Sequence, residues 1–344
     1  MRSLRASYLI LGMAVLFALG TVVFLAVRMV PTSEESEATP ASNPRKAEDP
    51  QRDPARLEVP RYAQQSARTE PNAGPSQPVP SPSSHYPAPS QANIDHYRYK
   101  VIKTYPHDRR CFTQGLAYED GFIYEGTGLY GQSALYKRDL QKGTIVKTLR
   151  LPDQYFGEGI TLFGDKLIRL TWQSNIGFVY TKDSFTPLRE FNYPGEGWGL
   201  THDDRHLILS DGTDTLRILD PNTYAEIGRI EVHDQGRPVP HLNELAYVTP
   251  PPSGVVDPQP AAAGPQIYAN VWPTDQIAII DPKTGRVTAW IDMSGLWTPP
   301  AEEQGESVLN GIAYLPETRH LLVTGKRWPR MYEIELVAQP ARQP

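Results

Sequence analysis

The stretch Phe156-Gly157-Glu158-Gly159-Ile160-Thr161 places one carboxylate between two glycines, at the start of a strand-like run. Four other stretches repeat its pattern around a Leu or Ile, at 112–116, 197–200, 242–245 and 309–312. The residue two positions before that Leu or Ile is Gln114, Glu158, Trp198, Asn243 and Asn310 in turn. Glu158 is therefore the single acid at five equivalent positions. We expect its flanking glycines to let the strand begin close to a bound ligand.

Each of the five stretches precedes further short apolar runs, separated by turns rich in Asp and Gly. The expected second strands are 122–125, 166–170, 206–210, 266–270 and 320–323. The expected third strands are 134–136, 177–180, 215–219, 276–280 and 331–334. Fourth strands are expected at 145–149, 188–191, 227–232 and 287–291. Four-stranded units that recur every 40–50 residues or so are typical of propeller blades, so the sequence predicts an all-β fold, a five-bladed β-propeller.

The last repeat is longer and incomplete. Proline-rich residues 249–265 and a second stretch, 296–307, read as loop insertions before the fifth unit. That unit ends near Leu336 without a fourth strand, and the run 97–102 can supply it. Pairing the two ends of the domain in this way would close the ring and leave no free sheet edge at the seam.

The N-terminal region differs in composition from the repeats. Residues 8–27 contain no charge and follow Arg2 and Arg5, so 1–30 reads as an uncleaved signal anchor whose transmembrane helix matches a bilayer core of about 30 Å. A cleavable signal peptide is the alternative, and the chain would then be secreted. Either reading places the remainder outside the cytoplasm, in the periplasm or the extracellular space.

The predicted domain boundaries follow from these patterns. Residues 31–96 contain 13 prolines with much Ser, Ala, Glu and Gln, and we expect a disordered, extended spacer. The predicted propeller covers 97–336, and 337–344 form a tail.

Composition excludes several classes of function. The net charge of the 344-residue chain is −5, and no basic run with interleaved aromatic residues suggests nucleic acid as a partner. Cys111 is the only cysteine, so it allows no internal disulfide and no cysteine-based zinc site, and it reads as a small packed residue. The eight histidines have no metal-ligand spacing, and neither a nucleophile elbow nor a phosphate loop occurs. The channel could still hold a structural cation.

In a propeller the first strand of every blade lines the central channel. Gln114, Glu158, Trp198, Asn243 and also Asn310 should therefore meet at one mouth. The ends of the second strands add Trp172, Trp272 and Lys326 to the same mouth. Each of these residues could instead serve packing or a structural hydrogen bond. Taken together, an aromatic-walled pocket with one acid, one amine and several amides suits a small polar, uncharged or cationic group.

Motifs from every unit resemble one known family. They are Phe-Thr-Gln-Gly-Leu (112–116), Glu-Gly-Thr-Gly-Leu-Tyr-Gly-Gln-Ser (125–133), Phe-Gly-Glu-Gly (156–159), Leu-Thr-Trp-Gln (170–173), Glu-Gly-Trp-Gly-Leu-Thr (196–201), Leu-Asn-Glu-Leu (242–245), Ala-Asn-Val-Trp (269–272), Leu-Asn-Gly-Ile-Ala-Tyr (309–314) and Val-Thr-Gly-Lys-Arg-Trp-Pro (323–329). This set resembles the plant-type glutaminyl-peptide cyclotransferases, which also occur in bacteria. The resemblance covers 97–336 and leaves out the anchor and the linker.

The resemblance implies an enzyme that converts the N-terminal glutamine of peptides and proteins to pyroglutamate with release of ammonia, in a propeller unrelated to the zinc-dependent animal enzymes. It implies Glu158 as the catalytic acid and base. It implies a substrate pocket of Phe112, Gln114, Phe156, Trp172, Trp198, Asn243, Trp272 and Lys326, with no cofactor. We expect Glu158 to shuttle a proton from the α-amine to the leaving nitrogen. We expect Gln114, Asn243 and Lys326 to hold the γ-carbonyl oxygen.

Two other classes of function remain open at this point. A non-catalytic propeller could bind an exported partner, and a metal-dependent propeller hydrolase or lactonase would need a set of Asp, Glu and Asn ligands. The five channel positions do not offer such a set, since they hold a single acid.

Overall fold

The computed structural model describes residues 94–250 and 264–339. The expected anchor, nearly all of the expected linker and most of the tail lie outside the described residues. Within them the chain is all-β, with one short 3-10 segment, η2 (Ala301–Glu303), in the second expected loop. In this part of the chain no helix has the length and apolar character needed to cross a membrane.

Three sheets each contain four strands in sequential order. The first sheet contains β2 (Thr113–Glu119), β3 (Phe122–Thr127), β4 (Ala134–Asp139) and β5 (Ile145–Arg150). The second contains β6 (Gly157–Phe163), β7 (Lys166–Thr171), β8 (Ile176–Thr181) and β9 (Pro187–Asn192). The third contains β10 (Leu200–His202), β11 (Leu207–Ser210), β12 (Thr215–Leu219) and β13 (Glu226–Glu231). These strands agree with the expected ones to within a few residues at each end.

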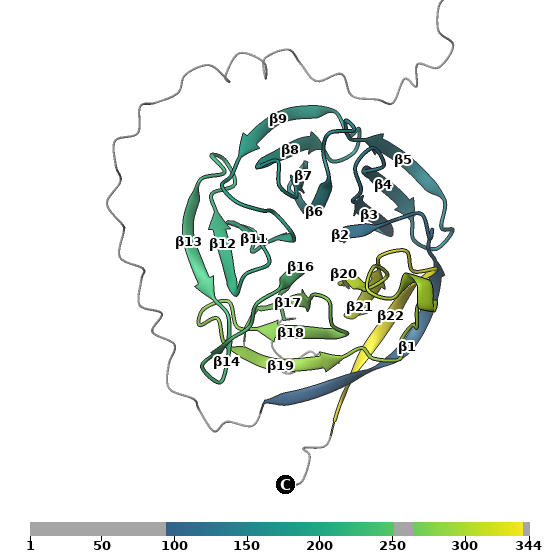
Figure 1. The fold of residues 1–344 in the computed structure, drawn as a ribbon, viewed down its shortest axis with the longest axis vertical. Coiled ribbons are helices and arrows are strands. Elements are labelled where there is room, and N and C mark those ends of the chain that lie inside the picture. The colour runs from purple at the N-terminus through teal and green to yellow at the C-terminus, as the bar shows by residue number, and fades with distance from the viewer. Residues whose placement is uncertain (1–93, 251–263, 340–344) are drawn as a thin grey trace, which may run out of the picture. The chain divides into compact units, whose positions relative to one another are not determined.

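The remaining long strands form one eight-stranded sheet in the order β16-β17-β18-β19-β1-β22-β21-β20. Its first run is β16 (Leu242–Val248), β17 (Gln266–Val271), β18 (Gln276–Ile280) and β19 (Val287–Asp292). Its second run is β20 (Leu309–Leu315), β21 (His320–Gly325), β22 (Arg330–Ala338) and β1 (Asp95–Pro106). Figure 1 shows β2, β6, β16 and β20 nearest the centre of the fold, with β5, β9, β13 and β19 toward the outside.

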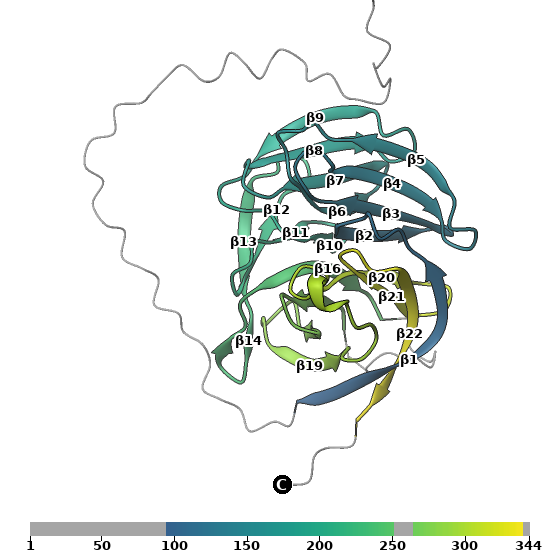
Figure 2. The same cartoon turned by 45° about the vertical axis from the view of Figure 1, so that its right-hand side comes forward.

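Strand β1 joins the two runs. It pairs antiparallel with β22 from Tyr97↔Ala338 to Pro106↔Arg330, and its first residues pair parallel with β19. Both views show β1 lying along β22 (Figures 1 and 2). The expected pairing of 97–102 with the last unit is therefore confirmed. The parallel contact with β19 was not expected, and it merges two four-stranded units into one sheet.

The core lies between neighbouring sheets, so every sheet is buried on both faces. In β7, Leu167 packs with the first sheet and Ile168 packs with the third. In β17, Ile267 packs with the third sheet, and Tyr268 packs with the run β20 to β22. Successive side chains of a strand point to opposite faces, which explains why the inner strands are short continuous apolar runs.

A small hairpin, β14 (His233–Asp234) and β15 (Arg237–Pro238), interrupts the passage from β13 to β16. Because β13 is the last strand of its sheet and β16 is an inner strand, this connection runs from the outside of the fold toward the centre (Figure 1). The repeat pattern in the sequence does not predict this hairpin.

The glycines beside Glu158 make room for close packing, a role that the sequence did not predict, and their expected closeness to a ligand stays a prediction. A methyl group at Gly159 would lie 2.5 Å from the carbonyl oxygen of Trp198, where the next inner segment approaches. The Gly159 N–H donates to that oxygen at 2.8 Å. A methyl group at Gly157 would lie 1.7 Å from Nη2 of Arg169, so this glycine makes room for a buried guanidinium.

Glu244 occupies the equivalent of Gly159 in β16 and has no exposed surface. Its Oε1 accepts from the backbone N–H of Leu116 at 2.9 Å, and its Oε2 accepts from the N–H of Ile312 at 2.8 Å. One carboxylate thus joins three inner strands, β2, β16 and β20. The inner strands are held in fixed relative positions, and so are the side chains at their starts.

Candidate active site

A pocket of about 410 Å³ lies where the inner strands begin. It is lined by Phe112, Gln114, Leu129, Phe156, Glu158, Trp172, Trp198, Asn243, Trp272, Gly305, Glu306, Lys326 and Arg327. All nine site residues that the family resemblance implied are in this lining, whereas Asn310, which the repeat also placed at the channel mouth, is not. Leu129 belongs to one of the quoted motifs, Arg327 follows Lys326 in another, and the other two residues come from the second expected loop. None of these four had been assigned to the pocket.

Glu158 lies near the start of β6, and only 5% of its surface is exposed. Its Oε1 accepts a hydrogen bond from Nε2 of Gln114 at 3.0 Å. Asn310 in turn donates from Nδ2 to Oε1 of Gln114 at 3.2 Å and to the carbonyl oxygen of Thr113 at 3.0 Å. Asn310 therefore does not line the pocket. It fixes which end of the Gln114 amide faces the acid.

Burial raises the pKa of Glu158 well above its usual value. The positive charges of Lys326 and Arg169 oppose this effect, whereas the negative charge of Glu196 adds to it. Burial also lowers the pKa of Lys326, and Glu158 opposes that shift. The site therefore holds an acid and an amine in an environment that favours the neutral form of both. Shifts of this kind, caused by burial and by a specific charged neighbour, are common where a side chain transfers protons.

Lys326 follows β21 and is almost fully buried. Its Nζ lies 4.9 Å from the centroid of the Phe112 ring, within the range of a cation–π contact. The ring thus forms part of the amine's surroundings as well as a wall of the pocket.

Arg169 is fully buried, and its guanidinium group packs against Gly157, the residue before Glu158. Its Nη2 donates to the carbonyl oxygen of Thr127 at 2.5 Å and so links β7 to β3. Burial lowers its pKa to about 10, which leaves the guanidinium charged at neutral pH. This cation partly offsets the cost of an ionised Glu158. An arginine in a strand core carries no sequence signal for such a role.

The aromatic walls pack edge to face. Phe156 and Trp172 have ring centroids 5.6 Å apart, and Trp198 and Trp272 have centroids 5.9 Å apart. One carboxylate connects these two pairs, because Oε2 of Glu196 accepts from Nε1 of Trp172 at 2.7 Å and from Nε1 of Trp198 at 2.8 Å. Glu196 stands two residues before Trp198 in a motif quoted above, but its contact with Trp172 depends on the fold and was missed.

Asn243 lies at the start of β16 with 3% of its surface exposed. Within the described part of the chain its Oδ1 has no hydrogen-bond partner. A buried polar atom that lacks a partner is costly, so this amide is suited to a polar group of a bound ligand.

A second cluster of ligand-type side chains lies outside the pocket lining. This cluster contains His107, Cys111 and Glu125, whose possible metal-ligand atoms all lie within 4.8 Å of one another. No other such group of three or more occurs in the described ranges. Arg138 donates to Sγ of Cys111 at 3.2 Å and to Oε2 of Glu125 at 3.3 Å. Its guanidinium already supplies the positive charge that a metal ion would bring, so the donor set fits a buried ion-pair network better than a metal site.

The buried position of Cys111 agrees with the expectation of a small packed residue. Burial raises the pKa of the thiol, so it stays protonated and is a poor nucleophile.

The fold and the pocket define an all-β protein whose pocket combines a buried acid, a buried amine and aromatic walls. The family model described as "Glutamine cyclotransferase" matches residues 79–336. The chain therefore belongs to the glutamine cyclotransferase family, as the sequence motifs had indicated.

Two known proteins are similar to it over most of its length. The chain is 38% identical to a glutaminyl-peptide cyclotransferase of Arabidopsis thaliana over 247 residues, which is 71% of this chain and 72% of the relative. It is 33% identical to the crystallised glutaminyl cyclase of Myxococcus xanthus, with a TM-score of 0.61 over 72% of this chain and 100% of that one.

Proposed function

We propose that this protein is a glutaminyl-peptide cyclotransferase, which closes the N-terminal glutamine of peptides and proteins to pyroglutamate and releases ammonia. The observation that carries the proposal is the position of Glu158. It is the buried acid among the residues that line an aromatic-walled pocket, within the region that matches the family. The two relatives bear names of this same activity.

The reaction is an intramolecular acyl transfer. The α-amine nitrogen of the substrate attacks its own γ-carboxamide carbon, forming a new C–N bond. The old C–N bond then breaks, and the leaving nitrogen departs as ammonia. The attacking nitrogen must lose a proton and the leaving nitrogen must gain one, so one carboxylate can carry that proton between them. No atom outside the substrate and the protein is needed for this balance.

Glu158 is assigned the proton transfer, because burial places its pKa nearer to that of an α-amine, about 7.7–8.0. The ammonium group of Lys326 and the Nδ2 N–H groups of Asn243 are assigned to the γ-carbonyl oxygen, where negative charge develops as the ring closes, because Oδ1 of Asn243 can only accept. We assign Gln114 a different role from the one expected, since its N–H points to Glu158 and holds the acid in place. The rings of Phe112, Phe156, Trp172, Trp198 and Trp272 would keep the glutamine side chain folded toward its own amine.

We propose the five-bladed propeller as the architecture behind this site. The three four-stranded sheets serve as three blades, and the two runs of the eight-stranded sheet serve as the other two. Five apolar clusters, each between a pair of neighbouring four-strand units, support this count.

We also propose that residues 1–30 anchor the enzyme in a membrane, with the catalytic domain outside the cytoplasm. The support is the uncharged run 8–27 with arginines on its N-terminal side. Cell fractionation of the full chain and of a chain lacking 1–30 would test this, together with protease treatment of intact cells. Full-length protein recovered in the soluble fraction would contradict the anchor.

Release of ammonia from a peptide that begins with glutamine tests the proposed activity. We expect ammonia and a pyroglutamyl product from the Gln peptide and none from the same peptide beginning with Asn. A scaffold that only binds a partner would release no ammonia. A metal-dependent enzyme would lose its activity with a chelator, whereas we expect turnover to be unchanged.

A further inference from the structure

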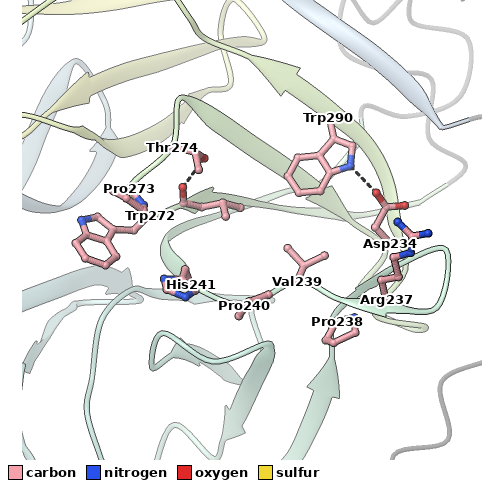
Figure 3. Close-up of a pocket in the computed structure, with 11 residues that line it drawn as sticks. Asp234, Arg237, Pro238, Val239, Pro240, His241, Trp272, Pro273, Thr274 and Trp290 are labelled. Atoms are coloured by element: carbon pink, nitrogen blue, oxygen red, sulfur yellow. Dashed lines mark hydrogen bonds between the residues drawn. The ribbon is translucent and has the colours of Figure 1, made fainter. Parts of the chain in front are cut away.

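A second cavity, of about 440 Å³, lies beside the proposed active site. Figure 3 shows Pro238, Val239, Pro240 and His241 along one side of this groove, with Trp272 at one end and Trp290 at the other. The first side belongs to the connection between β13 and β16, which contains the small hairpin. No sequence motif had pointed to this groove.

The groove adjoins the active site at one shared side chain. Trp272 lines both cavities, and the ring of His241 stacks on it with centroids 6.0 Å apart. Trp272 directly follows β17, whereas Trp290 lies on β19, the outermost strand of its run. The groove therefore leads from the rim of the pocket toward the outside of the fold. A chain that leaves the pocket over Trp272 would enter it.

The lining suits an extended polypeptide. Its walls are mainly proline, valine and tryptophan, which bind apolar side chains without presenting many donors. At the outer end, Asp234 accepts from Nε1 of Trp290 through Oδ2 at 3.1 Å (Figure 3). Its other oxygen, Oδ1, is buried and has no hydrogen-bond partner among the described residues. Because Oδ1 is buried, the Asp234 side chain would have to turn to present it to a backbone N–H of a bound chain.

We propose that this groove binds the substrate residues that follow the N-terminal glutamine, with an apolar side chain against Trp290 and a backbone N–H donated to Asp234. This inference rests on the proposed function. A reaction at the glutamine needs only the central pocket, so the groove would distinguish long substrates from short ones. It would lower KM or raise kcat/KM for peptides long enough to reach Trp290.

The test compares two substrates, the dipeptide amide Gln-Ala and the pentapeptide amide Gln-Ala-Leu-Phe-Ala, by the rate of ammonia release. For the unaltered protein we expect kcat/KM to be roughly tenfold higher for the pentapeptide, the effect of about 1.4 kcal/mol of added contact. Trp290→Ala should abolish that difference and leave the dipeptide rate unchanged. Trp290→Phe should retain most of it, because the apolar wall remains.

Tyr247→Ala is the matched control, because Tyr247 packs on the same apolar cluster as Trp290 without lining the groove. It should leave the ratio of the two rates as in the unaltered protein. If Trp290→Ala fails to fold, Asp234→Ala tests the same ratio and should reduce it severalfold. Equal rates for the two peptides in the unaltered protein would overturn the proposal that the groove binds substrate, and would leave the proposed function intact. A loss of the ratio in Tyr247→Ala would do the same, whereas absence of ammonia from both peptides would contradict the proposed function and the groove with it.

Discussion

Nε2 of Gln114 lies 3.0 Å from Oε1 of Glu158, although the two residues belong to different sheets and are 44 positions apart in the chain. The same amide receives a hydrogen bond from Asn310, which comes from a third sheet. Glu158 is therefore oriented before any substrate arrives, by a relay that depends on all three inner strands holding their relative positions. Such preorganisation keeps a catalytic carboxylate effective, since no reorganisation is needed during the reaction.

Replacing the acid should stop the reaction and spare the fold. Glu158→Gln keeps the shape of the side chain but cannot carry a proton, so kcat should fall by about 10²–10⁴. Ammonia release from a Gln peptide measures this, with Glu190→Gln, an exposed carboxylate on β9, as the control. Turnover of Glu158→Gln close to that of the unaltered protein would contradict the assignment.

The acidic side of the pH–rate profile should move in opposite directions in two variants. Burial raises the pKa of Glu158, the charge of Glu196 raises it further, and that of Lys326 lowers it. Glu196→Gln removes the negative charge but keeps an oxygen for both indoles, so the acidic limb of kcat/KM should shift to lower pH. Lys326→Met should shift it to higher pH. Shifts of the same sign in both variants would show that the limb does not report Glu158.

Glu158 should also make the native protein less stable at neutral pH than at acid pH. Its folded pKa is raised by burial above the usual 4.5, so the folded state holds the proton more tightly than the unfolded state does. The resulting stability is complete below pH 4.5 and is lost as the pH rises through the folded pKa. Glu158→Gln, a mimic of the protonated form, should therefore unfold at higher denaturant concentration than the unaltered protein at pH 8. The difference should vanish near pH 4, and an equal difference at both values would refute this account.

Glu244 should matter for stability far more than an ordinary glutamate. Glu244→Ala leaves the buried N–H groups of Leu116 and Ile312 without acceptors, at about 1–3 kcal/mol each, so unfolding free energy should fall by about 2–6 kcal/mol. Urea denaturation followed by tryptophan fluorescence measures the change. Glu190→Gln should stay within about 0.5 kcal/mol. A similarly small effect of Glu244→Ala would mean that water replaces the carboxylate.

The sequence predicted the strands and most of the proposed pocket residues because both follow from a repeat, whereas Phe112 and Phe156 were assigned through the family resemblance. Positions such as Gln114, Glu158 and Asn243 occupy the same phase of successive inner strands, and a repeat of that kind places them around one axis. Asn310 has the same phase but does not line the pocket, since its amide is used by Gln114. The position of a residue within the repeat predicts where the residue lies in the fold. It does not predict which neighbour the side chain contacts.

The contacts that the sequence did not predict all cross between repeats. Glu196 joins two tryptophans from different strand ends, Arg169 donates to the carbonyl oxygen of Thr127 in the neighbouring sheet, and Glu244 accepts from the inner strands of two other four-strand units. The groove beside Trp272 depends on a hairpin that is inserted in a single connection between units. A repeat pattern does not predict such an insertion. Such features depend on side-chain direction and on insertions, and a pattern of apolar periodicity contains neither.

The pairing of β1 with β22 has a consequence for the order of folding. Lys100 and Glu335 are bonded across a separation of 235 residues, one of the longest contacts in the described chain. During synthesis β1 is made first, and its antiparallel partner is made last, so the seam can close only when every other strand already exists. Closing so large a loop late is slow. Until then the apolar strands of the last unit have an open edge, and the newly made chain is at its most prone to aggregate.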